Sequence, residues 1–120
     1  MVERVTTPFS YSSAVVAGDY IFLGLHRGEG ATFAEQIRDA IVYLDNTLRK
    51  CGASLDRIVK ISVYLKHIAD LPEMEKIFFD YFAKDHFPAR MTTTTEFIDE
   101  DCLVMIDGIA YTPAASPSHT

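Results

Sequence analysis

The sequence has no long hydrophobic run. No stretch approaches the roughly 20 apolar residues that a helix needs to cross a bilayer, so we expect no membrane association. The first four residues, Met1 to Arg4, include two charged side chains and lack the apolar segment of a secretory leader. These two absences lead us to expect a cytoplasmic protein.

Cysteine is scarce, with Cys51 and Cys102 as the two copies in the chain. They are far apart, and neither has a partner at the Cys-x-x-Cys spacing of zinc and redox sites. Without a secretory leader, they are expected to be reduced thiols. Metal-ligand spacing is also missing around His67, His86 and His119, so we expect no metal site.

Positive charge is in deficit, with 11 Lys and Arg residues against 17 Asp and Glu and a net charge of −6 at pH 7. Nucleic acids bind clustered basic residues, and the densest cluster here is Arg57, Lys60 and Lys66. We therefore expect no nucleic-acid partner. The chain also lacks the glycine-rich phosphate loops of nucleotide-binding proteins, so no cofactor is expected.

With 120 residues, the chain has the length of one domain. Its 48% hydrophobic and 23% charged residues are ordinary for a globular protein that forms its own core. Residues 1–112 are predicted to form this single domain. Residues 113–120 are rich in Pro, Ser and Ala, have little to bury, and are predicted to be a flexible tail.

The spacing of apolar residues predicts two helices and five strands. Residues 33–51 carry an apolar stripe at helical spacing, and Thr32 with Glu35 forms a capping box before it. Residues 58–65 alternate as in a strand with one buried face. The remaining predicted elements are a helix at 71–84 and strands at 11–17, 19–26, 90–97 and 103–111.

The order of these elements, β-β-α-β-α-β-β, predicts an α+β fold with both helices on one face of a mixed sheet. Residues 26–30 are polar and rich in glycine, and are predicted to form a loop. The sheet face without helices would be partly apolar. A protein of this size usually covers such a face with another subunit, so we expect self-association.

Arg90 is the first candidate functional residue. It follows Phe87-Pro88-Ala89 and begins a predicted strand, so the rigid proline turn fixes its position. A guanidinium group can grip a carboxylate with two parallel hydrogen bonds. The alternative is an ordinary surface arginine in an ion pair.

Several ordered segments carry a resemblance that covers about residues 5–112. They are Pro8-Phe9-Ser10-Tyr11-Ser12, Gly18-x-x-Ile21-Phe22, Phe33-x-x-Gln36, Cys51-Gly52-Ala53-Ser54-Leu55, Ile58-Val59-Lys60, Phe87-Pro88-Ala89-Arg90 and Ile106-Asp107-Gly108-Ile109-Ala110. In this order they resemble the RidA/YjgF family of reactive-intermediate deaminases, formerly called L-PSP endoribonucleases. The chain looks like a divergent member.

The resemblance implies a chorismate-mutase-like homotrimer with pockets between subunits. It also implies a cofactor-free hydrolysis of enamines or imines to a keto acid and ammonia. Arg90 would bind the substrate carboxylate, and Tyr11 would line the same pocket. The expected partner is therefore a small carboxylate-bearing metabolite.

The chain departs from the family pattern at several pocket positions. The last strand of the family commonly reads V-E-I-E-A-I-A, and Met105 stands where its first glutamate positions the attacking water. Gly24-Leu25-His26 replaces the family's S-G-Q, and Glu75 replaces an asparagine. Asp107 would share a strand face with Met105, but about 7 Å away along the strand.

Other side chains are candidates for the missing chemistry. His26 titrates near neutrality and could supply acid–base help, and Glu75 could act with it. Thr92 shares the strand face of Arg90 and could hydrogen-bond a ligand. The alternatives are an exposed loop histidine, a solvated helix glutamate and a threonine that simply suits a strand.

Two functions remain open. The first is an enamine or imine deaminase, with the altered pocket suited to a specialised substrate such as an aminomuconate-type acid. The second is a non-catalytic trimer that binds a metabolite or a protein after losing the glutamate. A ribonuclease is a weaker third interpretation, because the net charge is −6.

Overall fold

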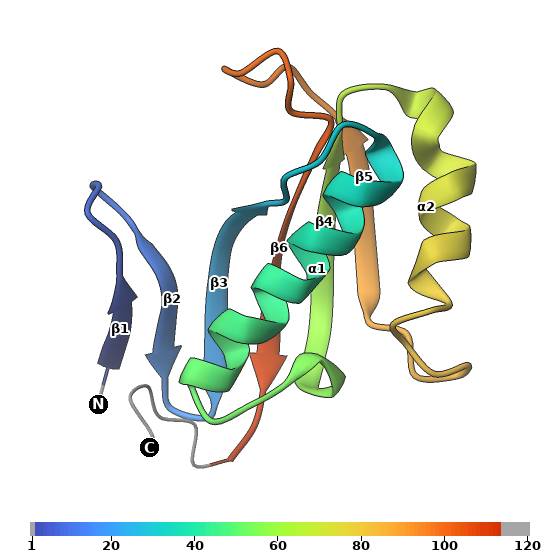
Figure 1. Ribbon diagram of the computed structural model, residues 1–120. Helices are drawn as coiled ribbons and strands as arrows, with labels where there is room; N and C mark the ends of the chain where they lie inside the picture. Colours follow the sequence, from blue (N-terminus) through green and yellow to red (C-terminus); the bar gives the residue numbers. More distant parts are fainter. Residues whose placement is uncertain (1, 114–120) are drawn as a thin grey trace.

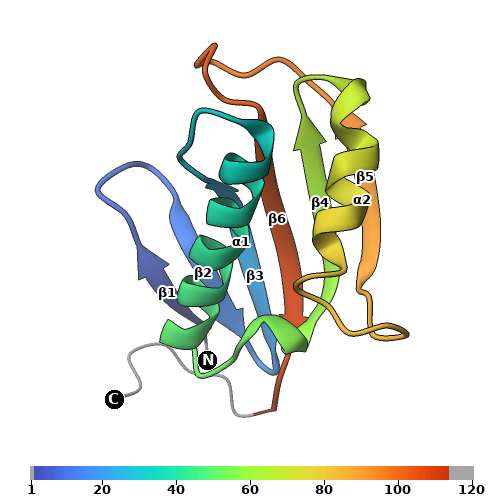
Figure 2. The same ribbon diagram turned by 45° about the vertical axis from the view of Figure 1, so that its right-hand side comes forward.

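The computed structural model describes residues 2–113, and the predicted tail from residue 114 onward lies outside them. A six-stranded sheet carries both helices on one face, as predicted (Figures 1 and 2). The elements are β1 (Val2–Thr6), β2 (Ser12–Ala17), β3 (Tyr20–Arg27), α1 (Phe33–Lys50), β4 (Ile58–Leu65), α2 (Leu71–Phe78), β5 (Ala89–Thr94) and β6 (Val104–Tyr111), with short 3-10 turns at Leu55–Arg57 and Ile68–Asp70. No helix within residues 2–113 is long and apolar enough to span a membrane.

The strand order across the sheet is β1-β2-β3-β6-β4-β5. Every neighbouring pair is antiparallel except β4 and β5, which are parallel and are joined by α2 as the crossover. The apolar pattern did not predict strand β1. This strand has few apolar residues and lies exposed at the sheet edge, so its pairing with β2 defines it more than its own pattern does.

The capping box predicted at the start of α1 is present, because the Thr32 hydroxyl accepts from the Glu35 amide and the Glu35 carboxylate accepts from the Thr32 amide. After α1 the chain turns through Gly52, whose φ of +80° favours glycine. The buried face of α1 packs on the sheet and forms the core with it. This core includes Ile37, Ile41, Leu44, Leu48, Ile21, Ile61, Val63, Leu65 and Ile106.

Two predicted elements end at least three residues earlier in the structure. Helix α2 ends at Phe78 instead of residue 84, because the amides of Phe79, Asp80 and Tyr81 donate to carbonyls three residues back, in hydrogen-bonded turns. Strand β5 ends at Thr94 instead of residue 97, since its partner β4 ends opposite it at Leu65. The predicted loop also begins later, because Arg27 still belongs to β3.

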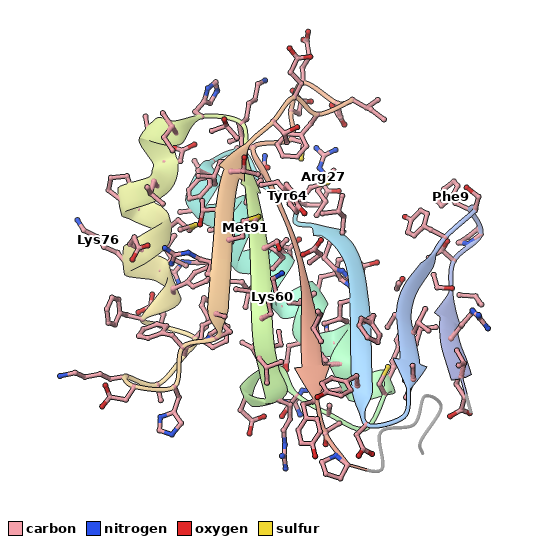
Figure 3. All side chains as sticks on the ribbon, turned by 180° about the vertical axis from the view of Figure 1, so that it is seen from behind. Phe9, Arg27, Lys60, Tyr64, Lys76 and Met91 are labelled. Atoms are coloured by element: carbon pink, nitrogen blue, oxygen red, sulfur yellow. The ribbon has the colours of Figure 1, made fainter. Side chains whose placement is uncertain are left out.

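The face of the sheet without helices is called the open face below. Figure 3 views this face and shows Lys60, Tyr64 and Met91 on it. Large apolar side chains are exposed on the strands that form the sheet, and they include Tyr20, Phe22, Leu25, Val59, Met91 and Tyr111. This agrees with the expectation that a sheet covered on one side has a partly apolar second face.

Candidate functional site

Arg90 lies on the edge strand β5, opposite Ile61 of β4. Because Ile61 is buried beneath the helices, Arg90 points to the helix side of the sheet, toward α2. Its Nη2 donates to the Glu75 carboxylate, and its Nε donates to Thr92 Oγ1 at 2.9 Å. The guanidinium carbon also lies 5.7 Å from the centre of the Phe78 ring, within cation–π range.

A small cavity of about 210 Å³ surrounds this group, and we call it the Arg90 site. It is lined by Glu75, Phe78, Phe79, Phe87, Pro88 and Arg90. The side chains of Arg90 and Glu75 are 30% and 47% exposed, so solvent reaches the pair. Exposed ion pairs contribute only about 0–1 kcal/mol, which a ligand carboxylate can offset when it takes the place of Glu75.

Tyr11 and Met105 line a second, larger cavity of about 640 Å³, which we call the Tyr11 cavity. Strand β3 pairs with β2 as far as Leu23, shifts register before His26, and continues along β6. Figure 1 shows the end of β3 curving away from β2 at this place. The cavity lies beside this divergence, and its other lining residues are Ser12, Gly24, Leu25, Arg27, Tyr43 and Ile98.

Arg90 and Met105 do not meet within one chain. Met105 is paired with Tyr64 of β4, three residues from Ile61, the partner of Arg90. Since side chains alternate along a strand, an odd spacing puts Arg90 and Met105 on opposite faces. A substrate that contacts both residues would therefore need a second copy of the chain.

His26 is not the loop residue that the sequence suggested. It belongs to β3, is fully buried, and packs against the ring of Tyr43 on α1 at 4.3 Å. Its Nδ1 donates to the Gly24 carbonyl at 2.7 Å, and its Nε2 lies 2.9 Å from Thr47 Oγ1. Burial lowers the pKa of His26 below its usual 6.5. His26 is therefore part of the buried interior between β3 and α1. It is not among the residues that we propose to contact substrate.

Asp107 is hydrogen-bonded within the sheet, and the two cysteines are buried. The Tyr64 hydroxyl donates to the Asp107 carboxylate at 3.3 Å, across neighbouring strands on the open face. Cys51 and Cys102 are free and buried, and burial raises the pKa of both thiols. Residues 2–113 contain no cluster of His, Cys, Asp or Glu that could hold a metal ion.

Comparison with known proteins identifies the family. The family model described as endoribonuclease L-PSP matches residues 2–112. The chain belongs to the RidA/YjgF family. A RutC family protein of Pyrococcus abyssi is 31% identical over 118 residues, which covers 91% of this chain and 92% of the relative. A RutC family protein of Drosophila melanogaster is 31% identical over 112 residues, covering 85% of this chain and 79% of the relative.

Solved structures of this RidA/YjgF family have the same fold. A YjgF family protein from Neisseria meningitidis superposes with a TM-score of 0.88 at 27% identity, over 93% of this chain and 95% of the other. A family member from Mycobacterium tuberculosis gives a TM-score of 0.87 at 25% identity, over 93% of this chain and all of the other. The α+β fold expected from the resemblance is thereby confirmed.

Arg27 is the one charged residue among those that line the Tyr11 cavity, and no sequence motif singled it out. Its sequence position, next to His26 in a glycine-rich stretch, indicated a loop. Only the strand register, which puts Arg27 opposite Met105, places it beside a predicted site residue.

Proposed function

We propose that this RidA/YjgF protein hydrolyses a small enamine or imine that carries a carboxylate, without a cofactor. The observation that carries the proposal is the solvent-reachable pair of Arg90 and Glu75 in an apolar pocket. Arg90 would bind the substrate carboxylate and displace Glu75 from its guanidinium. The displaced Glu75 carboxylate would then be free to accept a proton within the same site.

The chemistry needs one proton acceptor and one anchored substrate. Water adds to the imine carbon, the C–O bond forms, and the electron pair of the C=N bond moves to nitrogen. Glu75 takes one proton from the water and passes it to nitrogen, which gives a carbinolamine. Glu75 then takes the proton of the new hydroxyl group and passes it to nitrogen as the C=O bond forms and the C–N bond breaks. The products are the keto acid and ammonia. Holding the carboxylate in place lowers the entropy cost of the addition, and general-base help typically adds about 10²–10⁴-fold.

We further propose that the working form is a homotrimer. The exposed apolar residues of the open face, such as Phe22 and Met91, support burial against another copy. The separation of Arg90 from Met105 supports it as well, since only a second chain could bring the Tyr11 cavity to the Arg90 site. The ligand would then sit between subunits.

The direct test is ammonia release from 2-iminobutyrate generated in situ. The Arg90→Ala variant should lose at least about 90% of the activity, because a charge-assisted bidentate contact is worth more than about 1.4 kcal/mol. Arg38→Ala is the matched control, since Arg38 also forms an exposed ion pair, with Asp80 at 2.7 Å, and lies on α1. Equal activity of wild type and Arg90→Ala would contradict the anchor role.

A non-catalytic binding trimer is the second candidate, and one observation favours it. Met105 occupies the position where the family resemblance expects the water-positioning glutamate. In that case the protein would release no ammonia above the uncatalysed rate. It would still bind small keto acids such as 2-oxobutyrate through Arg90, and calorimetric titration of wild type against Arg90→Ala would detect this.

A further inference from the structure

Thr92 holds the guanidinium of Arg90 from the strand side of the Arg90 site. The two residues are two positions apart on β5, so both side chains point to the helix side of the sheet. Thr92 Oγ1 accepts the Arg90 Nε–H at 2.9 Å. Thr92 is half-buried, and its partner on β4 is the fully buried Val63. The acceptor for Nε therefore comes from the sheet and does not depend on the position of α2.

The contacts on the other side of the guanidinium come from α2, and Figure 1 shows this helix beside β5. Glu75 accepts from Nη2, and the centre of the Phe78 ring lies 5.7 Å from the guanidinium carbon. Under the proposed function the substrate carboxylate takes the place of Glu75. The hydrogen bond to Thr92 uses a different nitrogen and survives that exchange. Thr92 and Phe78 therefore remain to orient Arg90 in the complex.

The hydrogen bond to Thr92 also decides which side of the guanidinium can take a ligand. An arginine side chain carries one hydrogen on Nε and two on each Nη atom. Because Arg90 donates its Nε–H to Thr92, a carboxylate that approaches the Nε side finds that hydrogen in use. The end formed by Nη1 and Nη2 keeps hydrogens for two parallel bonds once Glu75 has left. The substrate carboxylate is therefore directed to this end.

We propose that Thr92 is a positioning residue for Arg90, which fixes the guanidinium so that its Nη1–Nη2 end receives the substrate carboxylate. This inference rests on the proposed function, because it concerns the same Arg90 anchor. It gives Thr92 a role through Arg90, whereas the sequence suggested a direct hydrogen bond to a ligand. The affinity for the ligand then depends on the Thr92 hydroxyl, although the ligand does not contact it.

Isothermal titration with 2-oxobutyrate, the keto-acid product of 2-iminobutyrate, tests this role. Thr92→Val removes the acceptor but keeps the shape and the strand preference of threonine. It should weaken binding about tenfold, as expected for loss of a hydrogen bond to a charged group. Thr92→Ser restores the hydroxyl and should bind within about twofold of wild type. Thr94→Val is the matched control, since Thr94 lies on the same face of β5 but farther from Arg90, and it should leave the affinity unchanged.

A variant of Arg90 separates positioning from direct contact. Arg90→Lys keeps the positive charge but has a carbon atom where arginine has Nε, so it cannot donate to Thr92 from that place. In the Arg90→Lys background, Thr92→Val should cause no further loss of 2-oxobutyrate affinity. A further loss of about tenfold in that background would show that Thr92 contacts the ligand directly, and would overturn the positioning role.

Nuclear magnetic resonance tests the same hydrogen bond without any ligand. The Nε–H signal of Arg90, assigned by its absence in Arg90→Lys, should exchange with water more slowly in wild type and Thr92→Ser than in Thr92→Val. Equal exchange rates, or equal affinity of wild type and Thr92→Val for 2-oxobutyrate, would overturn the inference and leave the proposed function intact. Equal affinity of wild type and Arg90→Ala, or no binding by wild type, would instead contradict the Arg90 anchor on which both depend.

Discussion

The carboxylate of Glu75 on α2 accepts a hydrogen bond from the guanidinium of Arg90 on β5. The two residues are 15 positions apart in the chain and meet because α2 is the crossover between parallel strands β4 and β5. The contact makes Arg90 the ion-pair partner of an acid in its own chain. In the proposed function, the substrate carboxylate therefore takes the place of Glu75 on Arg90.

This displacement predicts opposite effects of Glu75→Gln on binding and on rate. The affinity for the keto-acid product should rise, because the neutral amide competes less well for Arg90. The kcat for imine hydrolysis should fall by about 10²–10⁴-fold, as expected for loss of a general base. Glu73→Gln, a charge change in the first turn of the same helix, is the control and should alter neither quantity. A kcat unchanged in Glu75→Gln would rule out the proton-accepting role.

Met105→Glu tests whether a carboxylate on β6 reaches the same substrate. We expect the double variant Glu75→Gln/Met105→Glu to have a kcat at least about tenfold higher than Glu75→Gln alone. The reason is that Met105→Glu returns a general base to the position that the family pattern gives it. Met105→Gln in that background supplies the same shape without charge and should restore nothing. No rescue by Met105→Glu would indicate that the Tyr11 cavity and the Arg90 site do not share a substrate.

The apolar open face predicts the assembly state. Light scattering at micromolar concentration should give about three times the chain mass of 13.5 kDa. Phe22→Asp places a charge on the open face and should yield smaller species, because burying an unpaired charge is costly. Val42→Asp is the control, since Val42 is about as exposed as Phe22, at 46% against 45%, but lies on α1. A monomeric wild type would contradict both the trimer and a site shared between subunits.

The buried His26 predicts how stability depends on pH. Its pKa is lowered in the folded protein, so the unfolded chain takes up the proton first as the pH falls. The free energy of unfolding should therefore decrease below pH 6.5 or so, by up to about 1.4 kcal/mol per pH unit. Asp99, whose pKa Arg27 lowers, loses its contribution only below about pH 4.

Thermal melts between pH 5 and pH 7.5 would measure this effect. The His26→Gln variant keeps hydrogen-bonding groups but does not titrate, so its unfolding free energy should depend less on pH in this range. Wild-type stability that stays constant from pH 7.5 to pH 5 would show that His26 is protonated equally in both states.

Local patterns in the sequence were sufficient to predict most helices and strands of the fold. The capping box at Thr32 and the apolar stripe after it predicted α1, and the alternation in residues 58–65 predicted the observed bounds of β4. Both depend on interactions between near neighbours in the chain. The Phe87-Pro88-Ala89-Arg90 segment, with the other family motifs, also identified Arg90 as a candidate from the sequence alone.

Tertiary structure alone decided where the candidate side chains lie. Strand β1 exists because β2 offers it a partner, and His26 is buried because the bulged β3 passes beneath α1. The pairing of Arg27 with Met105 depends on strand register, which joins residues 78 positions apart and leaves no local mark in the sequence. The sequence therefore determined which reactive side chains the chain carries. The pairing of the strands determined that Arg90 and Met105 face opposite sides of the sheet.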